Sequence, residues 1–287
     1  MATGGEGRRR SAAGSGRSIR LSRRQAIAAG LGGVTGFALG QYVSLARPVS
    51  VPEDGDVGRY YWRWSEVDTS TAVPTVDWGQ PEAGPKVYPG ASDNALPAPP
   101  DDGFFAVVNK RRSQREYSDR SMSLDALSAL LFAAQGITSV TQGYRAAPSA
   151  GALYPIELYA IVGRVAGVQP GVYHYAVPWH SLELVQGGDF RQSLFEASLE
   201  QSAIQQAAVV LVLVAVFQRT RWKYKERSYR YILIEAGHIG QNICLAATAL
   251  GLGACPIGAF TDRALDTLLG VDGDREAAVY ELAVGPI

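Results

Sequence analysis

The sequence predicts an α+β domain in which a central sheet is wrapped by helices. Four segments rich in β-branched and aromatic residues predict strands, at residues 157–162, 172–177, 208–217 and 277–284. The third is so uniformly apolar that both of its faces must be covered. With 287 residues, of which 47% are hydrophobic and 19% charged, the chain can bury a substantial core.

Helical patterns fall between and before these strands. A short helix is expected over residues 104–110, after a cap at Asp101 and Asp102. Ser123 caps a second, whose apolar stripe is Leu124, Leu127, Leu130 and Leu131. We expect both helices to be half-buried. Residues 191–206 predict one further helix, and residues 228–250 another that is apolar on nearly every face, as in a helix buried in a core or a subunit contact.

Residues 1–46 are typical of a twin-arginine export signal. Arg23 and Arg24 directly precede an uncharged, Gly- and Ala-rich stretch, and small residues at 44–46 offer a cleavage site. A membrane anchor is the alternative, although five glycines dilute its hydrophobicity. The signal predicts export in the folded state by the twin-arginine machinery to the periplasm or cell envelope, with the N-terminus either cleaved or retained as an anchor.

Residues 47–100 predict an extended arm, because Pro, Gly, Asp and aromatic residues occur there without a sustained period. Trp62, Trp64, Trp78 and Tyr88 are expected to fix this arm to the globular domain of residues 101–287.

Charge and cysteine usage exclude several classes of protein. Residues 47–287 hold 20 basic and 26 acidic side chains, which argues against nucleic acid as the main partner. Two cysteines, Cys244 and Cys255, are too few for a disulfide scaffold and are expected to be reduced thiols on a helix and on the strand after it. The three histidines are scattered, and no cluster has metal-ligand spacing.

Residues 111–115, with the sequence Arg-Arg-Ser-Gln-Arg, are suited to a dianionic phosphate. Arg111, Arg112 and Arg115 can supply forked, charge-assisted hydrogen bonds, and Ser113 a hydroxyl. The segment follows a predicted helix, so a phosphate would meet the unfavourable end of the helix dipole and side chains must hold it. A solvated run of charge is the alternative.

Two segments of small residues complete a candidate flavin site. Pro148, Ser149, Ala150 and Gly151 form one, and a stretch that ends in Pro256, Ile257 and Gly258 forms the other. Small residues let backbone amides approach a flat ring. Taken alone, the first is a loop before a strand and the second terminates a helix.

The order of these motifs resembles the SagB-type dehydrogenase branch of the FMN-dependent nitroreductase superfamily, from about Asp77 to the C-terminus. Six segments carry the resemblance: residues 111–115, 124–136, 148–155, 171–175, 223–227 and 235–242. The resemblance implies an FMN cofactor, a nitroreductase-like fold and an obligate homodimer with the flavin between subunits.

The resemblance also implies roles for the candidate residues. Arg111, Ser113 and Arg115 would contact the phosphate and ribityl chain, while Arg112 either joins them or points outward. Pro148, Ser149, Ala150 and Gly151 would lie along the ring. Pro256, Ile257 and Gly258 would offer backbone N–H near flavin N5. Relatives often have a basic residue near the C-terminus that helps to bind phosphate, whereas this sequence ends Gly-Pro-Ile.

Lys223 and Tyr224 are the candidate catalytic pair, because in azoline-oxidising relatives a Lys-Tyr pair at this position handles the proton that leaves as hydride passes to flavin. They lie in a basic stretch, residues 218–230. For Lys223 to act as a base near neutral pH, neighbouring cations and burial must destabilise its ammonium by about 4 kcal/mol. A solvent-facing loop between strand and helix is the alternative.

Four polar residues, Glu235, His238, Gln241 and Asn242, lie on the long apolar helix. Buried polar side chains need partners, so we expect hydrogen bonds between helices or across subunits. A catalytic His238 is the less favoured alternative.

The sequence therefore predicts an exported FMN-dependent oxidoreductase that transfers hydride between flavin N5 and an organic substrate. The substrate is either a peptide azoline that is dehydrogenated or a small electron-poor quinone or nitro compound that is reduced. A noncatalytic flavin- or ligand-binding envelope protein is the alternative. No nicotinamide-binding Gly-x-Gly-x-x-Gly fingerprint follows a strand.

Overall fold

The computed structural model describes residues 55–67, 86, 88–91 and 95–287. All of them belong to one compact unit. The predicted export signal, most of the predicted arm and Trp78 lie outside the described residues.

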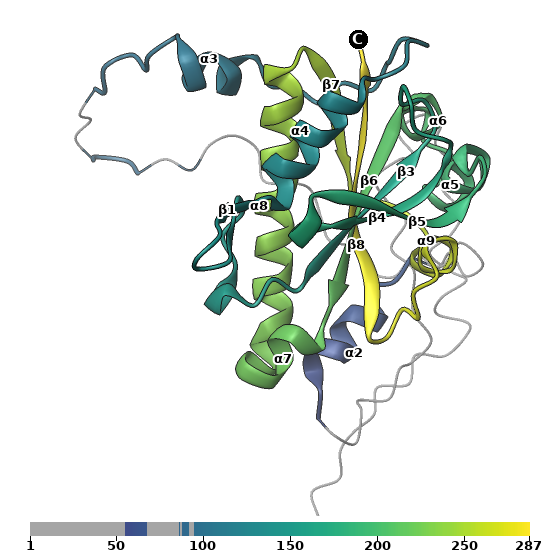
Figure 1. Cartoon of the computed structure of the whole chain (residues 1–287). Coiled ribbons are helices and arrows are strands. Elements are labelled where there is room, and N and C mark those ends of the chain that lie inside the picture. The colour runs from purple at the N-terminus through teal and green to yellow at the C-terminus, as the bar shows by residue number, and fades with distance from the viewer. Residues whose placement is uncertain (1–54, 68–85, 87, 92–94) are drawn as a thin grey trace, which may run out of the picture. The chain divides into compact units, whose positions relative to one another are not determined.

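An antiparallel six-stranded sheet in the order β5-β4-β3-β6-β8-β7 forms the centre of this unit (Figure 1). Its strands are β3 (Ile156–Val162), β4 (Gly171–Ala176), β5 (Ser181–Gly187), β6 (Val209–Val216), β7 (Leu252–Ile257) and β8 (Glu276–Pro286). The four strands predicted from composition are confirmed as β3, β4, β6 and β8, and β7 carries Cys255 as predicted. A separate two-stranded sheet pairs β1 (Ile137–Ser139) with β2 (Tyr144–Arg145).

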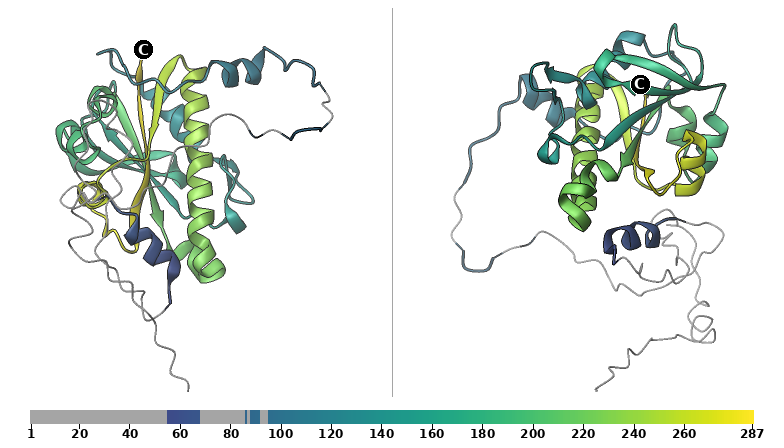
Figure 2. Two further views of the ribbon diagram at one scale, coloured as in Figure 1. Left: turned by 180° about the vertical axis from the view of Figure 1, so that it is seen from behind. Right: turned by 60° about the horizontal axis from the view of Figure 1, so that its bottom comes forward.

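The central strand β6 divides the core into two halves. Its side chains alternate between faces, so Leu211 and Leu213 belong to one hydrophobic cluster and Val210 and Val212 to the other. The first cluster is completed by α4 (Leu124–Gln135) and α8 (Ser228–Ala249), and the second by α5 (Arg191–Ala197), α6 (Ser202–Gln206) and α9 (Asp262–Leu269). Figures 1 and 2 show these two sets of helices on opposite sides of the sheet. The prediction of an apolar strand covered on both faces is confirmed.

Three helix predictions need correction. Residues 191–206 form two helices, α5 and α6, because Leu199 and Glu200 between them adopt left-handed backbone angles, with φ of 55° and 56°. Helix α3 (Gly103–Lys110) contains no buried residue, and Asp102 makes no side-chain cap. On α4, Ser123 does cap Ala126 N, but Leu124 is 46% exposed and lies outside the buried stripe.

The predicted arm contains a helix, α2 (Val57–Trp64), capped by Asp56. Trp62 packs edge-on against Phe217, with ring centroids 5.4 Å apart, so this residue fixes α2 to the domain as expected. Tyr88 is exposed and does not. No helix among the described residues is long and apolar enough to cross a membrane. Both cysteines are free and buried, as predicted.

Candidate active site

The 111–115 segment lies along the free edge of β7. Ser113 pairs with Ala254 as in a parallel bridge, and Gln114 N donates to the carbonyl of Ala254 at 3.0 Å. The segment is held there by the buried Tyr117, whose hydroxyl donates to the carbonyl of Ala283 at 2.9 Å. Because Ala254 precedes Pro256 by two residues, the structure brings the first and third sequence clusters together.

The arginines of this segment differ in their contacts. Arg112 turns back and donates to the carbonyl oxygens of Asn109 and Arg111 at 2.8 and 2.7 Å, so it follows the outward-pointing alternative. In the described part of the chain, neither Arg111 nor Arg115 forms an ion pair with a carboxylate. Helix α3 ends at this segment, as predicted, so an anion there has to be held by side chains.

Arg111 and Arg115 also lie near the two buried thiols. Burial raises the pKa of Cys244 to about 11 and that of Cys255 in the same direction, while Arg111 and Arg115 respectively oppose these shifts. Both arginines therefore lie within electrostatic range of these thiols, which belong to α8 and β7.

The 148–154 loop lies against the predicted catalytic pair. Gly151 has φ 63°, and a Cβ built there would lie 2.8 Å from both Lys223 Nζ and the Tyr224 hydroxyl. Ser149 Oγ accepts a hydrogen bond from Tyr154 N at 2.9 Å, which closes the loop. The second sequence cluster and Lys223-Tyr224 therefore form one group of residues.

These two groups of residues lie at different ends of the sheet. Across the sheet, Ala254 pairs with Val284, Val284 with Val209, and Val209 with Val162 at the C-terminal end of β3. The 148–154 loop, by contrast, leads into the N-terminal end of β3 at Ile156. Six residue steps along β3 and three strand spacings across the sheet correspond to about 25 Å. Figure 1 agrees, since α3 lies near the C-terminal end of α8 and α7 near its N-terminal end. One chain does not gather all the predicted site residues around a common space.

Lys223 and Tyr224 lie on a helix, α7 (Gln218–Tyr224), and not in a loop between strand and helix. Tyr224 is half-buried and packs edge-on against Tyr231, with centroids 5.0 Å apart, but Lys223 is exposed. The burial that a base at Lys223 would need is therefore not supplied within one chain.

Buried polar groups on α8 follow the prediction only in part. Glu235 is 2% exposed and its Oε1 has no hydrogen-bond partner among the described residues, whereas Asn242 Nδ2 donates to the carbonyl of Ala133 on α4 at 3.0 Å. His238 and Gln241 are exposed instead. Burial raises the pKa of Glu235 to about 7, although Ser149 and Arg145 both oppose this shift.

The same exposed side of α8 contains apolar residues. Leu233 and Ile234 are 41% and 50% exposed, and Gly237 lies one turn further along the helix. A helix from the core of a domain does not normally present such a face to water, so α8 has an apolar surface available for contact.

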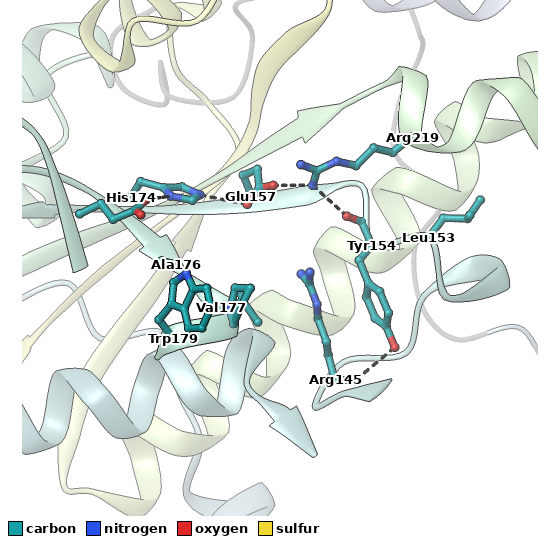
Figure 3. Close-up of a pocket in the computed structure, with 11 residues that line it drawn as sticks. Arg145, Leu153, Tyr154, Glu157, His174, Ala176, Val177, Trp179 and Arg219 are labelled. Carbon is teal, nitrogen blue, oxygen red and sulfur yellow. Dashed lines mark hydrogen bonds and ion pairs between the residues drawn. The ribbon is translucent and has the colours of Figure 1, made fainter. Parts of the chain in front are cut away.

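Sequence reasoning missed a charged pocket beside the 148–154 loop (Figure 3). Its polar side chains are Arg145, Tyr154, Glu157, His174, Glu183 and Arg219. They come from β2, the loop, β3, β4, β5 and α7, so only the fold brings them together. Tyr154 and His174 belong to two of the segments that carry the resemblance, residues 148–155 and 171–175, and Arg219 belongs to the basic stretch 218–230, but none of these segments predicts a shared pocket.

His180 also belongs to a network that the sequence did not indicate. Its Nε2 lies 2.8 Å from Ser128 Oγ and its Nδ1 2.7 Å from the Tyr175 hydroxyl, at a second cavity of about 640 Å³. Ser128 lies inside α4, where neighbouring N–H groups are used by the helix, so the donors that would stabilise an oxyanion are missing there. This geometry does not support acyl transfer.

Residues 108–286 match the model of the nitroreductase family, and the chain belongs to that family. It is accordingly a nitroreductase-family oxidoreductase. An archaeal relative, the predicted nitroreductase MJ1384 of Methanocaldococcus jannaschii, is 42% identical over 165 residues, which cover 58% of this chain and 83% of the relative.

Two relatives are processing proteins for trifolitoxin and for microcin B17. The trifolitoxin-processing protein TfxB of Rhizobium leguminosarum is 33% identical over 57% of this chain and 47% of its own length. The microcin B17-processing protein McbC of Escherichia coli is 28% identical over 59% of this chain and 68% of its own length. Together they support the SagB-type branch that the motifs predict.

Solved structures show the same fold. A predicted nitroreductase from Anabaena variabilis superimposes with a TM-score of 0.57 at 33% identity, covering 64% of this chain and 38% of the other. The Escherichia coli microcin synthetase complex McbBCD, at 24% identity and a TM-score of 0.57, covers 71% of this chain and 78% of the matched chain and shows the fold alone. The chain thus spans less than half of TfxB and of the Anabaena protein.

Proposed function

We propose that the protein binds FMN and transfers hydride between flavin N5 and an organic substrate, at a site built from two copies of the chain. The observation that carries this proposal is the division of the predicted site. Arg111, Ser113 and Arg115 lie beside the end of β7, with residues 256–258, at one end of the sheet, and the 148–154 loop lies with Lys223 at the other.

The first end fits the phosphate of a flavin. Arg111 and Arg115 provide two guanidinium groups that have no carboxylate partner among the described residues, which is the condition for binding an added anion. Gly253 lets the segment approach β7, since a Cβ there would lie 2.9 Å from Gln114 Cβ. A Cβ at Gly258, the residue after β7, would meet nothing within 4 Å, so space is open at the end of this strand.

A second copy would supply the other wall. The exposed apolar face of α8 can pair with itself across a two-fold axis, because such contacts are self-complementary. Two antiparallel copies of α8 would place the α7 end of one subunit beside the β7 end of the other. The homodimer would then have two identical sites, each with residues from both chains.

In such a site the residues have separate tasks. Bound FMN would supply the two-electron chemistry. Pro256 has no N–H and Ile257 lies inside β7, so Gly258 is the residue that would donate a backbone N–H towards the ring. Lys223 and Tyr224 would hold or accept the proton that accompanies hydride transfer, and their enclosure by the partner would supply the burial that one chain lacks.

The substrate belongs to one of two classes. TfxB and McbC are processing proteins for trifolitoxin and microcin B17, which supports dehydrogenation of azoline rings in a peptide. The predicted twin-arginine signal and the relation to MJ1384 support reduction of a quinone or nitro compound outside the cytoplasm. Export itself is tested by mass spectrometry of the N-terminus after expression with the twin-arginine machinery present or deleted.

The visible spectrum of the purified protein, before and after an anaerobic reductant, tests the central proposal. We expect bound FMN that is bleached by the reductant and reoxidised by a substrate of one of the two classes. Protein that contains no flavin and takes up none would overturn the proposal. Bound flavin that cannot be reduced would instead support a noncatalytic flavin-binding protein.

A further inference from the structure

A pocket of about 420 Å³ lies between the 148–154 loop, β4 and α7. Arg145, Glu157, His174, Glu183 and Arg219 supply its charge, and Val177 and Trp179 form an apolar side (Figure 3). Trp179 is 78% exposed at the rim, so its indole face is available to a bound molecule. None of these residues is part of the predicted FMN-binding set.

Most of the charge in this pocket is neutralised internally. Glu157 pairs with Arg219 and lies 3.0 Å from His174 Nε2, while His174 Nδ1 lies 2.9 Å from Glu183. The hydrogen bond with Glu157 raises the pKa of His174 against the effect of burial, and Glu183 adds to it. Burial alone would raise the pKa of Glu157, but its hydrogen bonds with His174 and Arg219 outweigh burial and lower it.

Arg145 is the cation without a counter-charge. Its guanidinium lies 4.5 Å from the centroid of the Tyr154 ring, and its Nη1 donates to Gln135 Oε1 at 2.8 Å. No carboxylate of the described residues lies within ion-pair distance of it. Burial lowers the pKa of Arg145, and the nearby Glu157 only partly offsets this effect. A guanidinium that is partly desolvated and paired only with a neutral amide gains from binding an anion.

The orientation of Arg145 is fixed before any ligand arrives. Gln135 is 1% exposed and donates to the carbonyl of Ile156 at 3.0 Å, so its amide oxygen is held towards Arg145. The backbone N–H of Arg145 also donates to the Tyr154 hydroxyl at 3.1 Å. Arg145 uses one guanidinium nitrogen in these contacts, which leaves donors of its planar fork for the pocket.

We propose that this pocket binds the carboxylate of an acidic organic substrate, with Arg145 as its main partner, Arg219 as the second, and the apolar body of the substrate against Val177 and Trp179. Glu157 and Glu183 are both engaged by His174 or Arg219, whereas no carboxylate of the described residues lies within ion-pair distance of Arg145, so the charge of Arg145 is left over. That balance fits a monoanion, and Glu157 disfavours a dianionic phosphate. A planar carboxylate also matches the fork of an arginine.

The pocket is connected to the proposed catalytic pair. Arg219 and Lys223 are four residues apart on α7 and thus neighbours on one face of the helix. Tyr154 and Gly151 belong to the same loop, and Gly151 touches Lys223. This inference rests on the proposed function in one respect: the substrate held at Arg145 is the one that would react at Lys223 and the flavin.

Binding is tested by isothermal titration calorimetry of the full-length protein with benzoate and with benzamide, its neutral analogue. We expect benzoate to bind and benzamide to bind at least about 10-fold more weakly, because the charged hydrogen bonds are lost. Arg145→Met should weaken benzoate binding by about 10-fold or more, and Arg145→Lys, which keeps the charge without the fork, by less. Arg191→Met, which removes an exposed arginine paired with Asp189, is the matched control.

Equal affinity for benzoate and benzamide would overturn the proposal, as would equal losses in the Arg145 and Arg191 variants. Tighter binding of inorganic phosphate than of benzoate would overturn the assignment to a carboxylate. Arg145→Lys keeps the test valid if Arg145→Met fails to fold. Because calorimetry does not depend on flavin turnover, protein that binds benzoate but contains no FMN would defeat the proposed function and leave this pocket assignment standing.

Discussion

The arginines at the two ends of the sheet differ in their partners. The β7 end contains residues 111–115, and the α7 end contains the 148–154 loop and α7. At the β7 end, Arg112 is bonded to its own backbone and Arg111 and Arg115 have no carboxylate partners among the described residues. At the α7 end, Arg219 pairs with Glu157 and Arg221 with Asp56. The first end therefore offers both of these guanidinium groups to a ligand, whereas at the second end two arginines are engaged in ion pairs.

The backbone differs in the same sense. The 111–115 segment pairs with β7 in ordinary extended geometry, whereas Gly151, Ala152 and Tyr154 all have positive φ, between 46° and 63°. Such angles cost energy in residues other than glycine and occur most often at functional sites. The α7 end thus offers a loop with an unusual backbone conformation, and the β7 end offers unpaired positive charge. The proposed FMN site needs both.

The largest expected effect comes from keeping the two ends apart. Ile234→Asp places a carboxylate on the exposed apolar face of α8, where a dimer would bury it without a partner. We expect a monomer by light scattering and FMN binding weakened by on the order of 100-fold or more. Val140→Asp, at a residue that is 91% exposed, should change neither. A dimer that persists in the Ile234 variant would contradict this account, because the β7 end of one subunit and the α7 end of the other would then come together without the α8 contact.

The next largest effect concerns the charge of the β7 end. Replacing Arg111 and Arg115 together with Ala should weaken FMN binding by about 100-fold or more, because each charged hydrogen bond contributes roughly 1.5–3 kcal/mol. Quenching of FMN fluorescence measures this affinity. Arg112→Ala should change it by less than about threefold, since Arg112 is bonded to its own backbone. Equal losses in all three positions would show a diffuse charge effect instead.

Glu235, at the α7 end, predicts a pH-dependent effect on stability. Its pKa of about 7 in the fold lies above the usual 4.5, so its contribution to stability is complete below about pH 4.5 and is lost as pH rises to about 7. Glu235→Gln, which cannot ionise, should gain up to about 3 kcal/mol of unfolding free energy at pH 8 relative to the native chain and nearly nothing at pH 4.5. Urea unfolding at both pH values gives the answer. An equal gain at both would mean that ionisation is not the cause.

The smallest expected effect comes from Gly151 in the 148–154 loop. It separates the cost of a positive φ from the effect of displacing neighbouring side chains. Gly151→Ala should cost about 1 kcal/mol for its positive φ and, in addition, displace Lys223 and Tyr224. Gly270→Ala has a similar φ of 76° but open space at the Cβ, so it reports the backbone term alone. Thermal unfolding and turnover are compared in both variants. If Gly151→Ala slows turnover no more than Gly270→Ala, the contact with Lys223 has no catalytic role.

The sequence predicted those parts of the fold whose signal is local. β6 is recognisable from its unbroken apolar run, and α4 from Ser123 and the leucines that follow it. β5 was missed because it is a mostly exposed edge strand with little apolar periodicity. The break between α5 and α6 was missed because Leu199 and Glu200, which adopt left-handed angles there, are not residues that mark such turns.

The candidate site could be predicted only in pieces. The motifs identified Arg111 and Gly151 as site residues, but they did not show which residues lie next to them. The fold determines this, since it places Ser113 beside Ala254 and Gly151 beside Lys223. The pocket around Arg145 and His174 was not predicted, because these residues share a space only when β2 and β4 come together with α7. Sequence motifs therefore identified the chemistry, and the fold decided which residues share a space.

Subunit complementation tests the two-copy site most directly. One chain carries Arg111→Ala and Arg115→Ala, the other a Gly151→Trp block in the 148–154 loop, and the two are co-expressed with different affinity tags. The account predicts that each homodimer loses FMN while the purified heterodimer binds one FMN, because one of its sites draws both intact halves from different chains. A heterodimer without FMN, alongside a native dimer that binds two, would contradict it.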